Sequence, residues 1–516
     1  MRRALQSPGI IRAFAIVCAI VMGDAWAPAL CAQQSDPWTA TAGDPFLLDA
    51  AAVTPWWLWN FKPPSLTAPA TGSTGNSDPA APEIQPSIEQ AAEGQTQTWN
   101  LHAQNTDIMQ GYPAISAKYS GVNSLPPGGQ IRETVSLDFY GGVRLWPGAE
   151  AHLDLLMWQG FGLHDTLGVD DFPNGEAYKV GTGYPRVNIA RLFIRQTIGF
   201  GGEQEDAPDD ELTLAGKQDI SRLTLTIGRL TPTDIFDKNT YAGDPRTQFM
   251  NWSLMANGAW DYPSDSLGYT TGLAIELNQP KWTLRYGFFQ MPRLKNNWTA
   301  EDAYFIWPGF SGAGDGEFFH AWGMVAEFER RYSIDAHPGA VRFLAYLNQE
   351  RMGSYHAALS IPGADISQTR AYRYKYGFGL NAEQEITQDA GVFSRLGWND
   401  GHEEAWMFTD INYTASLGIS IKGQRWQRPD DVVGLAGVLS GISRVNQRFL
   451  NAGGTDILDG DGALSYGPEE VLEIYYDCDI WKGIHFGADY QFVANPAFNR
   501  DRGPVSVLAT RLHVEF

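Results

Sequence analysis

The feature of this sequence that most constrains its fold is a repeated alternation of apolar and polar residues with a period of two. In residues 411–421, for example, Ile411, Leu417 and Ile419 alternate with Asn412 and Thr414. Successive side chains of a β-strand point to opposite faces, so this period predicts strands that each have one apolar face. The abundance of glycine (55 residues) and tryptophan (18 residues) fits strands and turns better than a helical bundle.

Sixteen segments carry the alternation, and many run about ten residues, the length that a tilted strand needs to cross a bilayer. They begin near residues 97, 134, 149, 188, 221, 269, 281, 318, 340, 372, 389, 407, 432, 470, 482 and 506. Connections at 146–148 and 278–280 are tight, whereas 159–187, 231–267 and 292–317 are long. We therefore expect an all-β fold, a transmembrane antiparallel β-barrel of about 16 strands with long loops on one side and short turns on the other.

Alternation alone does not say which face points outward, because a soluble β-sandwich alternates too. An even number of strands can close without leaving an edge, and the polar faces carry charges of both signs, as a water-filled lumen would. The last residues, 508–516, alternate up to Phe516. A closing strand with a terminal Phe is typical of barrels inserted into bacterial outer membranes, so these features together favour the membrane barrel.

Charge and hydropathy exclude two other classes of protein. Acidic residues outnumber basic ones by 59 to 37, which gives a net charge of −22 and makes nucleic acid an unfavourable partner. No run of about 18 apolar residues is present, so a conventional transmembrane helix is not expected.

The N-terminus has the order of a secretory signal peptide, which we place at residues 1–32: arginines, then an apolar run at 13–22, then small residues. Cleavage after Ala27 and cleavage near Cys31 both remain open. Residues 33–96 form a Pro/Ala/Gly-rich extension or linker, and residues 97–516 form the barrel domain. The extension 33–96 contains a Trp-rich cluster at 55–59, which fits a patch docked on the barrel, an anchor at the membrane interface or a plug-like insertion. Removal of residues 1–32 leaves Cys478 as the one cysteine, so we expect no intramolecular disulfide.

A series of short motifs adds a resemblance. They are WQGFGL at 158–163, FPNGEA at 172–177, GRL at 228–230, DIFDKN at 234–239, DPRTQFMN at 244–251, NAGG at 451–454, EVLEIYY at 470–476, DYQ at 489–491, NPAFNRDRGP at 495–504 and RLH at 511–513. In this order they resemble the carbohydrate-selective outer-membrane porin family (OprB type) over roughly residues 97–516. The resemblance implies a sixteen-stranded barrel that passes monosaccharides, glucose-like sugars above all, into the periplasm. The Pro-rich stretch at 62–86 departs from the family pattern.

Sugars are neutral and carry hydroxyls and C–H patches, so a selective lumen needs carboxylate–guanidinium pairs and aromatic faces. The candidate lumen and substrate-binding residues are Asp138, Arg144, Glu150, Asp154, Trp158, Arg191, Arg195, Arg229, Asp234, Asp237, Asn239, Arg246, Gln248, Asn251, Glu276, Arg285, Glu327, Glu473, Tyr475 and Gln491. Arg191 and Arg195 share one face of a strand and form a candidate basic track opposed by Glu150, Asp154 or Glu473. Residues 229–251 suit a loop folded into the channel, and an external loop is the alternative.

Tryptophans at segment ends suit an aromatic belt at the membrane interface: Trp99, Trp146, Trp158, Trp282, Trp398 and Trp481.

The sequence matches no complete enzyme or metal-binding motif. Residues 456–462 lack the acid that an EF-hand requires at position 457, so we expect an acidic turn, no metal site and no cofactor. Adjacent acids such as Glu469 and Glu470 point to opposite faces of a strand, so they do not form a glycosidase pair.

The sequence thus predicts a passive sugar-selective channel and no enzyme. Two alternatives stay open: a general ion-selective porin, and an exported β-rich carbohydrate-binding protein or hydrolase. The expected partners are outer-membrane lipid, monosaccharide substrates and the outer-membrane insertion machinery, which would read Phe516. A homotrimer and a monomer both fit the sequence.

Overall fold

The computed structural model describes residues 96–176, 181–292, 295 and 320–516. The predicted signal peptide (1–32) and all of the extension 33–96 except Thr96 lie outside the described residues. The same holds for most of the predicted connection 292–317.

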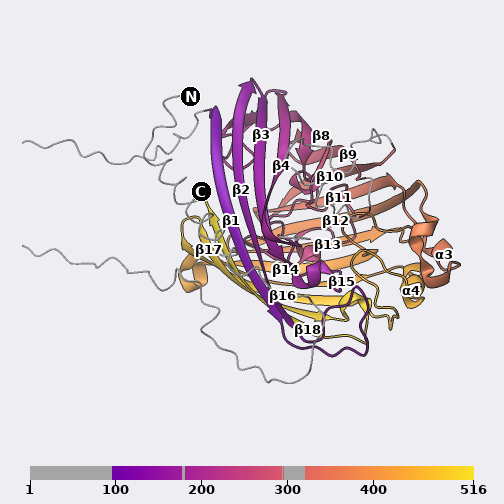
Figure 1. Ribbon diagram of the computed structural model, residues 1–516. Coiled ribbons are helices and arrows are strands. Elements are labelled where there is room, and N and C mark those ends of the chain that lie inside the picture. The colour runs from indigo at the N-terminus through magenta and orange to yellow at the C-terminus, as the bar shows by residue number, and fades with distance from the viewer. Residues whose placement is uncertain (1–95, 177–180, 293–294, 296–319) are drawn as a thin grey trace, which may run out of the picture. The chain divides into compact units, whose positions relative to one another are not determined.

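Sixteen antiparallel strands form one closed barrel, in which each strand pairs with the next barrel strand and β1 pairs with β18 (Figure 1). The barrel strands are β1 (Trp99–Tyr112), β2 (Gln130–Trp146), β3 (Ala149–Phe161), β4 (Gly181–Gly199), β7 (Arg222–Leu230), β8 (Thr270–Gln279), β9 (Trp282–Gln290), β10 (Trp322–Ile334), β11 (His337–Glu350), β12 (Arg373–Thr387), β13 (Ala390–Asn399), β14 (Tyr413–Gly423), β15 (Arg428–Gly441), β16 (Glu469–Trp481), β17 (Ile484–Ala494) and β18 (Val505–Glu515). The predicted fold class is therefore confirmed.

The connections differ strongly between the two ends of the barrel. At one end, tight turns such as 147–148 and 482–483 join strands, and the connection 200–221 adds the hairpin β5 (Gln204–Ala207) and β6 (Gly216–Asp219). At the other end, all connections are long. They carry the helices α2 (Trp252–Met255), α3 (Tyr355–Ala358) and α4 (Arg444–Asn451) and the 3-10 turns η4 (Leu163–Thr166), η5 (Pro232–Asp234), η7 (Pro362–Ala364), η8 (Ile366–Thr369) and η10 (Pro496–Phe498), while η9 (Gln424–Trp426) lies in a turn. We call these the turn end and the long-connection end.

Two strands show the largest differences from their predicted starts. β4 begins at Gly181 instead of near residue 188, and β14 begins at Tyr413 instead of near residue 407. The second difference has a clear cause: the backbone amides of Met407 and Phe408 donate hydrogen bonds to the Asp261 carboxylate, at 3.0 and 2.8 Å. These amides are therefore not available to a strand ladder.

Side chains alternate between the two faces of the barrel wall. On β12, Tyr374, Tyr376 and Phe378 are exposed on the outside, whereas Lys375 and Asn381 are buried on the inside. Apolar residues therefore face outward and polar residues face inward, as a lipid-embedded barrel requires.

Tryptophans at strand ends also follow this division. Trp99, Trp146, Trp398 and Trp481 are exposed on the outer face, where an aromatic ring can lie at a membrane interface. The belt interpretation is wrong for Trp158, which is 5% exposed on the inner face and packs against Tyr269. Among the described residues, no helix has the length and hydropathy needed to cross a membrane.

The outward face is testable at Leu417, which lies in the middle of β14 and is 66% exposed. We expect Leu417→Arg to lower the free energy of unfolding in lipid vesicles by about 2–4 kcal/mol, since it places a cation among acyl chains. Denaturant titration measures the change, and Leu417→Ala is the matched control. If both variants have the same stability, position 417 does not face lipid.

Candidate functional site: the interior of the barrel

Residues 231–269, which connect β7 to β8, fold into the barrel and reach the wall across from their own strands. The Glu473 carboxylate on β16 accepts hydrogen bonds from the backbone amides of Met250 and Asn251, at 2.6 and 3.0 Å. On β18, the Arg511 guanidinium donates to the backbone carbonyls of Pro245 and Gln248, at 2.6 and 2.9 Å. We call residues 231–269 the interior segment.

Asp237 anchors the first half of the interior segment. Its carboxylate accepts from the Arg395 guanidinium on β13 (3.1 Å) and from the Asn381 amide on β12 (2.7 Å). Its own backbone N–H donates to Glu327 on β10 at 2.8 Å. The backbone of Asp237 is left-handed, with φ of 57°, a conformation that Asp tolerates better than most residues. Asn239 continues the anchor through a 2.8 Å hydrogen bond to Asn381.

The second half of the interior segment is held by amides and rings. The Asn251 side chain donates to Gln491 on β17 at 3.1 Å. The Phe249 ring packs edge-on against Tyr475, with ring centroids 4.8 Å apart. Gln248 closes a turn inside the segment by accepting from the Gly243 amide at 2.8 Å.

Two arginines tie the interior segment to the other side of the wall. Arg246 lies 3.2 Å from Glu176 and 3.6 Å from Asp138 on β2. Arg191 on β4 donates to both carboxylate oxygens of Asp234, each at 2.8 Å, and to Asp154 on β3 at 2.7 Å. Burial raises the pKa of Asp234, but the Arg191 guanidinium outweighs it, so this pKa lies below its usual value.

A ladder of alternating charges crosses five consecutive strands. Arg285 on β9 lies 3.1 Å from Glu276 on β8 and 2.7 Å from Glu327 on β10. Arg342 on β11 lies 2.8 Å from Glu329 on β10 and 3.0 Å from Glu383 on β12. Glu329 also lies 3.1 Å from Arg285, so it links the two guanidinium groups, and donors and acceptors alternate along the inner wall.

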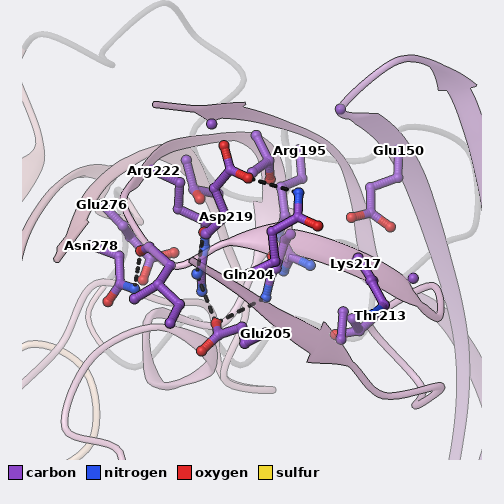
Figure 2. Close-up of a pocket in the computed structure, with 18 of the residues that line it drawn as sticks. Glu150, Arg195, Gln204, Glu205, Thr213, Lys217, Asp219, Arg222, Glu276 and Asn278 are labelled. Atoms are coloured by element: carbon purple, nitrogen blue, oxygen red, sulfur yellow. Dashed lines mark hydrogen bonds and ion pairs between the residues drawn. The ribbon is translucent and has the colours of Figure 1, made fainter. Parts of the chain in front are cut away.

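The turn end encloses a cavity of about 990 Å³ (Figure 2). The connection 200–221 forms one side of it: the backbone carbonyl of Leu212 accepts from Arg195 at 2.7 Å, and Asp209 accepts from Asn100 at 2.9 Å. Figure 2 shows Arg195, Arg222 and Lys217 interspersed with Glu150, Glu205 and Glu276 around the space. No aromatic side chain lines this cavity among the described residues.

The predicted site residues thus separate into two groups. Five line the cavity: Arg144, Glu150, Arg195, Glu276 and Arg285. Most of the other predicted residues hold the interior segment to the wall. Arg229, for example, forms an ion pair with Asp265 of that segment. Trp158 instead packs in an interior apolar cluster. The predicted basic track is only partly present: Asp154 pairs with Arg191, but Glu473 binds the interior segment, and Arg195 has no ion pair within the described residues.

Sequence reasoning missed several inward residues that organise the interior. The predicted lumen residues did not include Arg395, Asn381, Arg342 and Arg331. Two of these, Arg395 and Arg342, alternate with apolar residues on their strands, so the period of two could have identified them. The hairpin β5–β6 was missed because each of its strands has four residues and no apolar face.

A family model for the carbohydrate-selective porin, OprB family, matches residues 123–516. The chain belongs to the OprB family. It is therefore an outer-membrane channel protein and not an enzyme. The OprB fold is also found in Pseudomonas putida OprB at high pH, which is 15% identical with a TM-score of 0.62, covering 81% of this chain and 94% of that chain.

Two other solved structures align at lower similarity. The low-pH structure of Pseudomonas putida OprB is 11% identical with a TM-score of 0.43, covering 81% of this chain and 93% of that chain. The outer-membrane channel DcaP of Acinetobacter baumannii is 9% identical with a TM-score of 0.42, covering 81% of this chain and 97% of that chain. No curated protein matches the chain in sequence.

The long-connection end of this OprB protein has its own ion-pair centre at Glu404. Its buried carboxylate accepts from Arg370 at 2.8 Å and lies 2.9 Å from the Lys295 ammonium. Burial raises the pKa of Glu404, but Lys295 and Arg370 outweigh it and lower the pKa to about 2.

Removal of the anchor at Arg395 tests the role of the interior segment. Arg395→Met leaves the buried Asp237 carboxylate without its cation, at a cost of about 3–5 kcal/mol. We expect the interior segment to detach and single-channel conductance in planar bilayers to rise. Arg428→Met, which breaks the pair between the exposed Arg428 guanidinium and Asp431 near a turn, away from the interior segment, is the matched control. Unchanged conductance in Arg395→Met would mean that the segment does not narrow the channel.

Glu404 predicts an acid-labile contribution to stability. A carboxylate whose folded pKa lies below the unfolded value stabilises the fold above the unfolded pKa, and the stabilisation is lost as pH falls toward about 2. We expect Glu404→Gln to be less stable than wild type at neutral pH and to lose less stability between about pH 4.5 and 2. Urea midpoints in detergent measure this, with Glu403→Gln as control. Parallel pH profiles for Glu404→Gln and wild type would contradict the assignment.

Proposed function

We propose that the interior passes neutral, glucose-like monosaccharides by diffusion and that the turn-end cavity is a place where they bind in transit. The observation that carries this is the balance of charge in the cavity lining. Six side chains are basic and five are acidic: Arg144, Arg195, Lys217, Arg222, Arg285 and Arg331 against Glu150, Glu203, Glu205, Asp219 and Glu276.

A sugar hydroxyl both donates and accepts hydrogen bonds, so a wall of alternating guanidinium and carboxylate groups offers partners for each role. Hydrogen bonds to charged groups are stronger than those between neutral groups. Because the charges nearly cancel, the cavity gives little advantage to an ion of either sign. The volume of about 990 Å³ is at the upper end of the range for small-molecule sites.

Stacking on aromatic faces is not part of this binding mode in the cavity. The aromatic candidates Trp158 and Tyr475 are buried against Tyr269 and Phe249. We therefore assign sugar preference here to hydrogen bonding and to the width of the passage beside the interior segment.

The competing channel function is that of a general ion-selective porin. A change at Arg195 distinguishes the two functions. Its side chain lines the cavity and bonds only a backbone carbonyl among the described residues. The prediction of an exported soluble lectin or hydrolase as an alternative is wrong, because the chain belongs to a porin family and apolar residues such as Leu101 and Leu435 cover the outer face.

Current measurements in planar bilayers test the sugar proposal. We expect glucose to lower the single-channel current more than a solution of large dextran at equal viscosity does, because glucose occupies the passage and dextran does not enter it. Equal effects of the two solutes would contradict sugar binding in the channel.

The Arg195→Ala variant tests the charge balance. Removal of this cation leaves five basic and five acidic residues in the lining, so we expect a reversal potential shifted toward cation preference under a salt gradient. Arg425→Ala, in a turn outside the cavity, is the matched control. An unchanged reversal potential would place Arg195 outside the conducting path.

Export and assembly complete the proposal. We propose that residues 1–32 are removed as a signal peptide and that Phe516, which is 69% exposed, is read by the outer-membrane insertion machinery. The mass of the protein–detergent complex distinguishes a homotrimer from a monomer.

A further inference from the structure

Three aspartates meet at the long-connection end, outside the cavity and the charge ladder. Asp170 comes from the connection between β3 and β4, Asp410 from that between β13 and β14, and Asp459 from that between β15 and β16. One carboxylate oxygen of each lies within 4.8 Å of the other two, and all three residues are fully buried. Three segments far apart in sequence therefore bring their carboxylates to one point.

These carboxylates lack the partners that buried anions require. Both oxygens of Asp170, both oxygens of Asp459 and Oδ1 of Asp410 accept no hydrogen bond. Oδ2 of Asp410 accepts one, from the backbone amide of Leu458 at 2.7 Å. Within the described residues, no lysine, arginine or histidine forms an ion pair with any of the three.

Other fully buried carboxylates at this end of the barrel have a partner on at least one oxygen, as Asp171 does through Ser440 at 2.8 Å. Asp261 accepts from the backbone amides of Trp406, Met407 and Phe408, at 2.7, 3.0 and 2.8 Å. The Lys295 ammonium is also engaged elsewhere, at 2.7 Å from Asp456. Asp170 and Asp459 differ from these carboxylates because neither oxygen of either residue has a hydrogen-bond partner among the described residues.

A buried group of like charges is very costly unless an opposite charge offsets it. Calcium is bound by oxygen ligands at 2.3–2.6 Å, so ligands of one ion lie up to about 5 Å apart, which agrees with the spacing of the three carboxylates. Magnesium usually keeps several waters and is seldom held by protein groups alone. A fully buried site made of carboxylates therefore suits calcium better than magnesium.

We propose that Asp170, Asp410 and Asp459 form a calcium site that ties three long connections together. The neighbouring contacts fit a joint between these segments: the backbone amide of Gly168 donates to the Leu458 carbonyl at 2.8 Å, and Asn123 donates to the Asp459 carbonyl at 2.7 Å. The acidic run at 456–462 is not an EF-hand, and it supplies one ligand of a site that is completed by distant segments.

The experiment uses the full chain, folded in detergent free of lipopolysaccharide, because lipopolysaccharide itself binds divalent cations. Bound calcium is counted by equilibrium dialysis, and Tm is measured by tryptophan fluorescence in EGTA and in rising calcium or magnesium concentrations. Binding to the folded state alone raises Tm with the logarithm of the calcium concentration. We expect one ion per chain, a rise in Tm with calcium, and a smaller rise with magnesium.

Variants locate the ion. Asp170→Asn and Asp459→Asn should lose the calcium-dependent rise in Tm, yet in EGTA they should be at least as stable as wild type because one repelling charge is gone. A merely structural carboxylate would not show this reversal. Asp461→Asn is the matched control: Asp461 lies 3.8 Å from Arg502, so its loss lowers Tm but leaves the calcium response intact.

Two results overturn the proposal: folded wild type that retains no calcium, or an Asp170→Asn variant that keeps the wild-type calcium response. If neither Asp170→Asn nor Asp459→Asn folds, Asp410→Asn and the count of ions bound to wild type decide the question. Retention of one ion by wild type and its loss in Asp410→Asn support the site, and retention in both contradicts it.

Discussion

The pairing of β1 with β18 is the constraint on which the rest of the structure depends. A strand in hydrocarbon has no water for its N–H and C=O groups, so a membrane sheet has to close on itself. The two strands pair from Gln104 with Glu515 to Gly111 with Leu508, and the backbones of Ala103 and Phe516 exchange hydrogen bonds of 2.9 and 3.2 Å. Closure fixes an inside and an outside, and alternation then sends every second side chain into the lumen.

The lumen of a sixteen-stranded barrel is too wide to be filled by wall side chains alone. Two inserts contact its inner wall: residues 231–269 from the long-connection end and residues 200–221 from the turn end. Buried pairs such as Asp237 with Arg395 position the first insert, and the Arg195–Leu212 hydrogen bond positions the second. Such pairs contribute more to a defined geometry than to net stability, because desolvation offsets much of their attraction.

The sequence predicted what depends on local periodicity and left open what depends on register and on long-range contacts. Alternation was sufficient to place sixteen strands and to put Asp138 and Glu150 inside. The partners of Arg191 could not be predicted from the sequence. A bulge beside Ala190 changes which side chains of β4 face inward, and Asp234 lies 43 residues away along the chain. Trp158 shows the same limit: its place in a strand was predicted, but not the interior cluster that covers it.

The site made by Asp170, Asp410 and Asp459 could not be predicted from spacing at all. Its members lie on three connections, and only the folded barrel brings those connections to one end. Sequence motifs describe ligands that lie close together in the chain. They therefore detect an EF-hand, but they do not detect a site whose ligands come from three distant connections.

The central claim is that charged side chains surround water while apolar side chains face lipid, and paired cysteines test it most directly. In a chain whose native cysteines are replaced, Glu276→Cys lies on the cavity wall and Leu417→Cys on the outer face. A charged, membrane-impermeant thiol reagent should react with the cysteine at 276 and change the single-channel current, and it should leave the cysteine at 417 unmodified. The opposite pattern of reactivity would contradict the orientation of the barrel faces and the transport function that rests on it.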